Sequence, residues 1–245
     1  MEGNTHCYPK LYLIGDSNTQ MGFLQDGFAA KLSNEYIRRL DIVNRGFSGY
    51  TSDHLRVMMP KLLLNDNTPI GSLHTATILL GSNDSVLREL DARHVPVDRY
   101  KENIEFIVKS LREIGVKNII LISPPPVDDE TWYVFIQRMV KGTGTTSNTN
   151  VKLYAEVCKD IATNHSLHFI DLYSDLMKLD NWKTYFRDGL HFSSQGNQYL
   201  FSNLKDILDP LFQDLPCVYP DMTNNFTKEK LFQGVPYINN ENDLL

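Results

Sequence analysis

The 245-residue sequence has little cysteine, no excess of basic residues and no long hydrophobic run. Each of these features argues against one kind of protein. Its three cysteines, Cys7, Cys158 and Cys217, are widely spaced and form no Cys-x-x-Cys pair. This usage suits a reducing compartment and offers no zinc signature. We therefore expect a cytoplasmic protein.

The charge balance and the apolar runs exclude two kinds of partner. Lys and Arg number 24 against 30 Asp and Glu, a formal net charge of −6, without the basic excess that phosphate binding requires. No apolar stretch approaches the ~18–20 residues that span a bilayer, and the first residues lack the features of a signal peptide. We expect a soluble protein with no nucleic-acid partner and no membrane span.

Strand-like and helical patterns alternate along most of the chain. Short apolar runs predict strands at Lys10–Ile14, Asp41–Arg45, Thr75–Leu80, Asn118–Ser123 and His168–Asp171. Apolar residues at helical spacing predict helices at Phe28–Leu40, Leu55–Leu62, Asp98–Ile114, Val151–Thr163 and Ser193–Leu208. Such alternation predicts an α/β fold with a mostly parallel sheet covered on both faces.

The chain contains no internal repeat and no second core, so we expect one domain over residues 1–210. The polar tract 142–150 is interpreted as an excursion, because the alternation resumes after it. Residues 211–245 are polar but keep several aromatic residues. We expect this tail to pack on the body or on a partner subunit without forming a separate domain. Its aromatic residues are Phe212, Tyr219, Phe226, Phe232 and Tyr237.

Four polar segments follow strands or precede the last helix, where an open parallel sheet binds its ligands. They are Gly15-Asp16-Ser17-Asn18, Ser48-Gly49-Tyr50-Thr51, Gly81-Ser82-Asn83-Asp84 and Asp188-Gly189-Leu190-His191. Because the carboxyl ends of parallel strands meet at one rim, we expect all four segments to face a common site.

These residue types suffice for acyl transfer. Ser17 is the candidate nucleophile, His191 the candidate base and Asp188 the carboxylate that orients the imidazole. The N–H of Ser17, the N–H of Gly49 and the side-chain amide of Asn83 are the candidate oxyanion donors.

Each segment alone also has an ordinary structural explanation, because Asp, Ser and Asn favour turns and helix caps. Their joint occurrence, each at the correct end of a predicted element, favours the functional interpretation. Asp16 is expected to support the Ser17 turn through hydrogen bonds. His165 and His168, with Cys158 nearby, lack zinc-ligand spacing, and we predict no metal site.

On these four segments the sequence resembles the SGNH, or GDSL-type, hydrolase family. Three further features resemble its isoamyl acetate-hydrolysing esterase branch: Arg45–Ser52, Ser123-Pro124-Pro125-Pro126 and Asp188–Ser193. The resemblance implies a three-layer α/β/α fold with a flavodoxin-like sheet and a serine esterase that needs no cofactor. It also implies a small short-chain carboxylic ester as the substrate.

The sequence departs from the branch pattern at Ser82 and Ser85, where small apolar residues are expected, and in the length of the polar tract. Substrate preference therefore stays open, and the same catalytic residues suit a lysophospholipid, an acyl-thioester or an acetylated sugar. A non-catalytic binding protein on the same fold is the alternative of another class. A homodimer is compatible with the aromatic tail.

Overall fold

The computed structural model describes residues 8–65, 73–139, 145–215 and 217. Within these ranges the centre of the fold is a five-stranded parallel sheet of order β2-β1-β3-β4-β5. Its strands are β1 (Lys10–Gly15), β2 (Asp41–Gly46), β3 (Leu73–Leu79), β4 (Asn118–Ile122) and β5 (His168–Ile170). This order is that of the flavodoxin-like doubly wound sheet, so the predicted α/β class and parallel sheet are confirmed.

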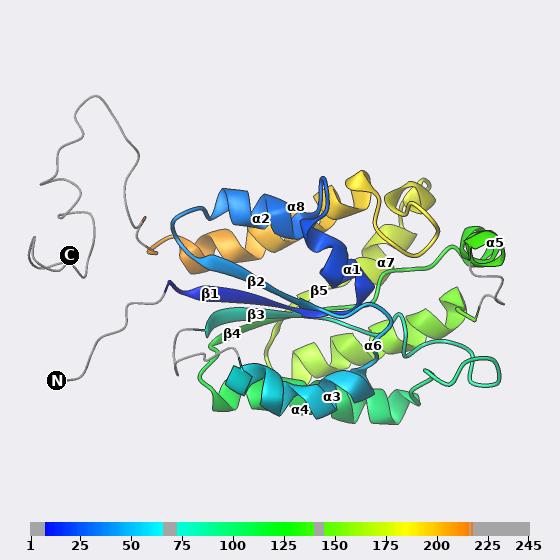
Figure 1. Cartoon of the computed structure of the whole chain (residues 1–245), viewed down its shortest axis with the longest axis horizontal. Helices are drawn as coiled ribbons and strands as arrows, with labels where there is room; N and C mark the ends of the chain where they lie inside the picture. Colours follow the sequence, from blue (N-terminus) through cyan, green and yellow to red (C-terminus); the bar gives the residue numbers. More distant parts are fainter. Residues whose placement is uncertain (1–7, 66–72, 140–144, 216, 218–245) are drawn as a thin grey trace, which may run out of the picture.

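Helices cover both faces of the sheet, which gives three layers (Figure 1). One face carries α3 (Ser52–Asn65), α4 (Val97–Glu113) and α6 (Asn148–Asn164). The other carries α2 (Phe28–Glu35), α7 (Leu172–Met177) and α8 (Ser194–Phe212). The short helices α1 (Ser17–Gln20), η1 (Met21–Phe23) and η2 (Trp182–Tyr185) lie in the connections, and α5 (Asp129–Met139) follows β4.

Alternation along β1 supplies both halves of the core. Leu11 and Leu13 pack with α2 and α8, whereas Tyr12 and Ile14 pack with α3 and α4, and all four side chains are fully buried. A central strand that is apolar on both faces is typical of a parallel sheet between two helical layers. The sequence of β1 therefore suits an interior position in the sheet.

Two helices end at residues other than those predicted, one because of a local break in the helix and one because of a contact with a distant residue. Helix α2 ends at Glu35, and Arg38 adopts a left-handed φ of 61° before β2. Helix α8 continues through Pro210 to Phe212, whose ring packs edge-on against Tyr36 at 5.1 Å. Burial of Phe212 stabilises this last turn although the proline removes one backbone hydrogen bond.

Other parts of the prediction fall on residues that the structure does not describe. These are residues 142–144 of the polar tract and, apart from 217, the tail beyond residue 215. Within the described ranges, no helix combines the length and the hydrophobicity needed to cross a lipid bilayer.

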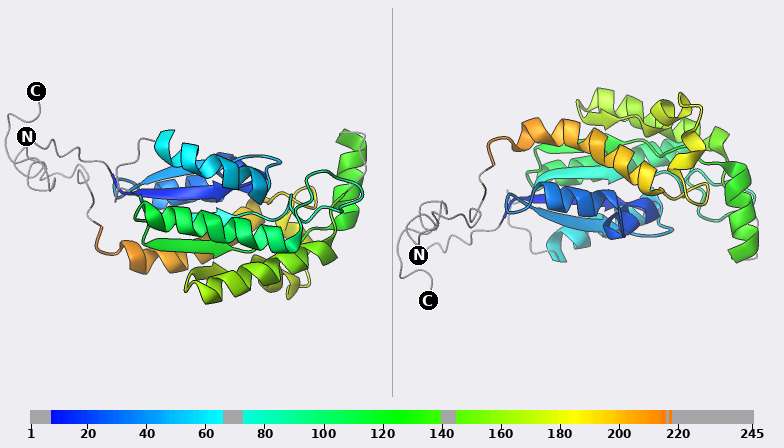
Figure 2. Two further views of the ribbon diagram at one scale, coloured as in Figure 1. Left: turned by 90° about the horizontal axis from the view of Figure 1, so that it is seen from below. Right: turned by 90° about the horizontal axis from the view of Figure 1, so that it is seen from above.

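All five strands run in one direction, so their carboxyl ends lie at a single rim. Helix α5 stands beside this rim, away from the helices that cover the sheet (Figures 1 and 2). None of its eleven residues is buried. The rim is therefore bordered by a helix that contributes little to the core.

Candidate active site

Ser17 lies at the rim directly after β1, at the first position of α1. The preceding Asp16 caps this short helix by accepting a hydrogen bond from the Asn18 N–H at 3.0 Å. Gly15 is required by close packing, because a Cβ there would lie 2.1 Å from Thr19 Oγ1 and 2.6 Å from the Leu79 carbonyl oxygen. The Ser17 side chain is thus placed by a tight strand-to-helix turn.

His191 and Asp188 come from one loop between η2 and α8 and reach Ser17. His191 Nε2 lies 3.0 Å from Ser17 Oγ, and His191 Nδ1 lies 2.7 Å from Asp188 Oδ2. The three side chains therefore form one continuous chain of hydrogen-bond contacts. The structure brings together the three residues predicted from the sequence as nucleophile, base and orienting carboxylate, although 171 positions separate Ser17 from Asp188.

The loop itself is held in shape by the second oxygen of Asp188. Asp188 Oδ1 accepts hydrogen bonds from the backbone N–H groups of Leu190 at 3.0 Å and His191 at 2.8 Å. Gly189 adopts a φ of +93°, a conformation that L side chains rarely take. The Asp-Gly-x-His spacing thus follows from a turn that the aspartate stabilises.

The environment keeps Asp188 ionised. Burial alone would raise its pKa, but the hydrogen bond from His191, the attraction of the imidazole and two backbone N–H groups outweigh it. The pKa of Asp188 is therefore lowered from its ordinary value. An ionised Asp188 can accept a hydrogen bond from His191 Nδ1 and leave Nε2 free to take a proton.

Asn18 connects the two distant parts of the site. Its Oδ1 accepts a hydrogen bond from the Phe192 N–H at 3.0 Å, and its Nδ2 donates to the Leu190 carbonyl at 3.4 Å. The residue after Ser17 is therefore bonded to the residues on either side of His191. Sequence reasoning did not single out Asn18, because only the folded chain shows where its amide points.

The candidate oxyanion donors lie in the segments that follow β1, β2 and β3. Gly49 has a φ of +80°, and among the described residues no atom beyond its own chain neighbours lies within 4 Å of where its Cβ would stand. Its N–H makes no hydrogen bond to any part of the chain that the structure describes. Asn83 is 7% exposed and donates from Nδ2 to the carbonyl of Tyr50, the neighbour of Gly49, at 3.0 Å. The segments that carry Gly49 and Asn83 therefore lie against each other.

Two carboxyl groups are buried beneath this rim. Burial raises the pKa of Asp16 to about 6, and burial together with the negative charge of Asp16 raises that of Asp84 to about 7. Asp84 Oδ1 accepts a hydrogen bond from the Ser52 N–H at 2.9 Å. Oδ2 of each aspartate has no hydrogen-bond partner among the described residues. Asp16 therefore combines the predicted support of the Ser17 turn with an unusually high pKa.

A hollow of about 300 Å³ adjoins His191. Its lining includes Met21, Leu24, Arg187 and Phe192. On another side, the ring of Trp132 from α5 meets the His191 ring edge-on, with centroids 5.6 Å apart. His191 thus has an open space on one side and an aromatic contact on another.

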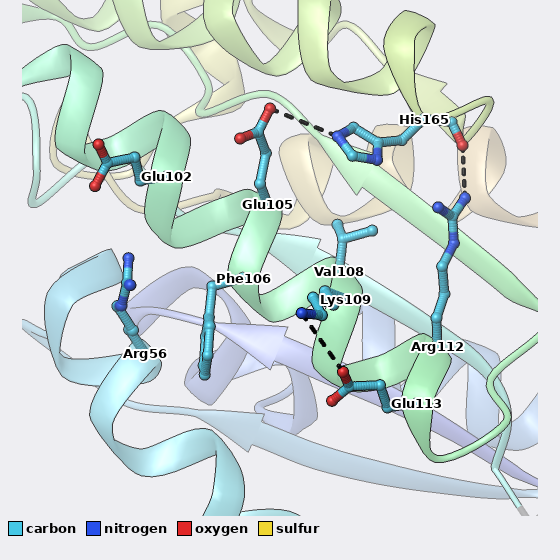
Figure 3. Close-up of a pocket in the computed structure, with 9 residues that line it drawn as sticks. All are labelled: Arg56, Glu102, Glu105, Phe106, Val108, Lys109, Arg112, Glu113 and His165. Carbon is cyan, nitrogen blue, oxygen red and sulfur yellow. Dashed lines mark hydrogen bonds and ion pairs between the residues drawn. The ribbon is translucent and has the colours of Figure 1, made fainter.

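A larger hollow of about 660 Å³ lies along α4, where Figure 3 shows charged side chains from α3 and α4 and His165. Its charges largely pair with each other, as Lys109 does with Glu113 at 3.8 Å and His165 with Glu105 at 3.5 Å. It contains none of the predicted site residues, and α4 and His165 lead into the amino ends of β4 and β5. The hollow beside His191 is the one of the two that borders a predicted catalytic residue.

Metal ligands are not grouped in the parts of the chain that the structure describes. In those ranges no three His, Cys, Asp or Glu side chains are placed to hold an ion. His165 instead pairs with Glu105, and Cys158 is buried within 3.0 Å of the Tyr100 hydroxyl.

Comparison with known proteins gives a consistent match over most of the chain. The GDSL-like Lipase/Acylhydrolase family profile matches residues 13–199. "Isoamyl acetate-hydrolyzing esterase 1 homolog" of Rattus norvegicus is 34% identical over 225 residues, covering 89% of each chain. The homolog of the same name from Homo sapiens is 32% identical, covering 89% of this chain and 88% of its own. Among solved structures, a lipase/acylhydrolase from Enterococcus faecalis has a TM-score of 0.65 at 24% identity, covering 82% of this chain and 95% of its own.

Proposed function

The chain belongs to the GDSL-like lipase/acylhydrolase family and is a carboxylic-ester hydrolase, and from this premise we propose that it cleaves short-chain esters through a covalent acyl-serine intermediate. The observation that carries the proposal is the contact of Ser17 Oγ with His191 Nε2 at 3.0 Å, continued to Asp188 at 2.7 Å. A nucleophile, a base and an orienting carboxylate in this order are the requirements of acyl transfer by serine.

In the first half of the proposed reaction, Ser17 Oγ attacks the ester carbonyl carbon while His191 Nε2 removes its proton. The carbonyl oxygen becomes an oxyanion that accepts hydrogen bonds from the N–H groups of Ser17 and Gly49 and from Asn83 Nδ2. The imidazolium, stabilised by Asp188, then gives its proton to the alcohol oxygen as the carbon–oxygen bond breaks. The alcohol leaves and the acyl group stays on Ser17.

In the second half, His191 takes a proton from water, and the resulting hydroxide attacks the acyl-serine carbonyl. The same three donors hold the second oxyanion, and His191 returns the proton to Ser17 Oγ as the carboxylic acid departs. The cycle is redox-neutral and needs only the ester and one water molecule.

Two relatives of this chain favour a small substrate. The rat and human relatives are named for the hydrolysis of isoamyl acetate, a short ester, and resemble this chain over most of its length. This similarity supports acetate-type esters over long-chain lipids.

The test combines active-site labelling with a substrate series. A fluorophosphonate should add once to the full-length protein, intact mass and peptide mapping should place the adduct on Ser17, and His191→Ala should slow the labelling. Ser17→Ala should lower kcat on p-nitrophenyl acetate by on the order of 10⁶. Ordinary activity of the Ser17→Ala protein would contradict the mechanism.

The substrate class is tested separately with p-nitrophenyl esters from acetate to dodecanoate, a lysophospholipid, an acyl-thioester and an acetylated xylooligosaccharide. We expect kcat/KM to be highest for the short simple esters. A maximum on any of the other substrates, with labelling at Ser17 intact, would contradict the substrate and preserve the mechanism.

A further inference from the structure

We propose that Arg93 is a positioning residue that holds the Asn83 amide with its N–H group toward the oxyanion. This inference rests on the proposed function, because it concerns one of the three candidate donors. Arg93 lies in the connection after β3, ten residues beyond Asn83, and its Nη1 donates to Asn83 Oδ1 at 3.1 Å.

The two ends of the Asn83 amide have partners of opposite kind. Oδ1 accepts from the Arg93 guanidinium, and Nδ2 donates to the Tyr50 carbonyl at 3.0 Å. An amide NH₂ has two hydrogens, so one N–H of Nδ2 remains for a substrate oxygen. Asn83 is almost fully buried, so water contributes little to its orientation.

Rotation of this amide by 180° would make both contacts repulsive. The NH₂ group would face the guanidinium, which only donates, and the oxygen would face the Tyr50 carbonyl, which only accepts. The flipped amide would also present a lone pair to a developing negative charge. Arg93 thus supplies one of the two contacts that select the productive orientation.

Arg93 is itself held in place, which distinguishes it from an ordinary surface arginine. Its Nε donates to Asp91 Oδ1 at 3.0 Å, and its Nη2 donates to Asp91 Oδ2 at 2.5 Å. The Thr145 hydroxyl donates to the same Asp91 Oδ2 at 2.9 Å. The side-chain hydrogen bond from Arg93 is the main cause of the lowered pKa of Asp91, which is about 2. The guanidinium fork is therefore fixed on one side and directs Nη1 toward Asn83.

The guanidinium also acts electronically on the donor. A charged donor on Oδ1 draws electron density from the amide and makes the opposite N–H a stronger donor. The Arg93 side chain is 43% exposed and paired with Asp91, so solvent and the carboxylate reduce its direct attraction for the oxyanion. The effect on the reaction is therefore transmitted mainly through Asn83.

The test is a double-mutant cycle in the full-length enzyme with p-nitrophenyl acetate. Arg93→Ala should lower kcat roughly tenfold with little change in KM, a fraction of the roughly 10²–10³ lost when a whole oxyanion donor is removed, as in Asn83→Ala. In the Asn83→Ala background, Arg93→Ala should change kcat by less than about twofold, because its target is gone. A merely structural role would give the same factor in both backgrounds.

Two further variants separate position from charge. Arg88→Ala removes an exposed arginine from the same connection and should leave kcat unchanged. Arg93→Lys keeps the charge but cannot contact Asp91 with two nitrogens and Asn83 with a third, so it should lose activity much as Arg93→Ala does. Full activity of Arg93→Lys would overturn the positioning role.

Binding of an oxyanion mimic provides a readout independent of turnover. The inhibition constant of a trifluoromethyl ketone should rise by the same factor by which kcat falls in Arg93→Ala. An unchanged constant would overturn the inference. If Asn83→Ala leaves kcat unchanged, the proposed oxyanion site is wrong. If Asn83→Ala lowers kcat but Arg93→Ala does not, only the role of Arg93 is wrong.

Discussion

Replacement of Asp84 by asparagine should make the protein more stable at neutral and alkaline pH. Asp84 is fully buried, and burial together with the charge of Asp16 raises its pKa to about 7. Asparagine has almost the same shape and keeps an oxygen that can accept the 2.9 Å hydrogen bond from the Ser52 N–H. It replaces the unpartnered Oδ2 with an NH₂ group and cannot ionise.

The sign and the size of this change in stability follow from proton linkage. Between the ordinary carboxyl pKa of 3.8 and the folded value of about 7, the folded state keeps a proton on Asp84 that the unfolded state has lost. Stability therefore falls as pH rises through this window. At about 1.4 kcal/mol per pKa unit, the loss is on the order of 4 kcal/mol by pH 8.

The measurement is urea unfolding of the wild type and of Asp84→Asn at several pH values from 4 to 8. The stability difference between the two proteins should be near zero at pH 4 and grow with pH in favour of the variant. Asp160→Asn, which changes an exposed aspartate on α6, should show no such trend. A difference for Asp84→Asn that is independent of pH would refute the reasoning.

Three other substitutions and one treatment test the site and its loop. Asp188→Asn should lower kcat by about 10⁴ with the circular dichroism spectrum unchanged, because an amide no longer fixes the imidazole tautomer; activity within tenfold of wild type would contradict this. Gly189→Ala should lower the free energy of unfolding by more than about 1–2 kcal/mol, measured by urea, because φ is +93° there and the added Cβ would lie 2.6 Å from the Trp132 backbone nitrogen. Asn18→Ala removes the partner of the Phe192 N–H, so kcat should fall about tenfold while fluorophosphonate still labels Ser17. Exhaustive chelation should leave turnover undiminished, and loss restored by a divalent ion would contradict the proposed mechanism.

The layered fold could be predicted because its signals are local. Every predicted strand is present, and the stripe of Ile104, Ile107, Val108 and Leu111 is buried in α4 as its spacing requires. Helix α7, in contrast, was not predicted. It is only six residues long, and its Asp171 cap and three buried side chains depend on the sheet around them.

The candidate site could be assembled from the sequence because its residues follow strand ends, and parallel strands bring these ends together. The contacts that support the site could not be assembled in this way. Asn18 bonds to residues more than 170 positions away, and Trp132 reaches His191 from α5. Arg93 is only ten residues from Asn83, but a charged residue in a polar loop carries no sign of the amide that it contacts.

The residues of helix α5 are under a different constraint from the residues of the core. The residues of the sheet and its covering helices must satisfy close packing, so most changes there reduce stability. Helix α5 has no buried residue, yet its Trp132 touches the imidazole of His191. Substitutions at the exposed positions of this helix should therefore reduce stability less than substitutions in the core, and random libraries confined to residues 129–139 are the economical route to variants with new ester preferences.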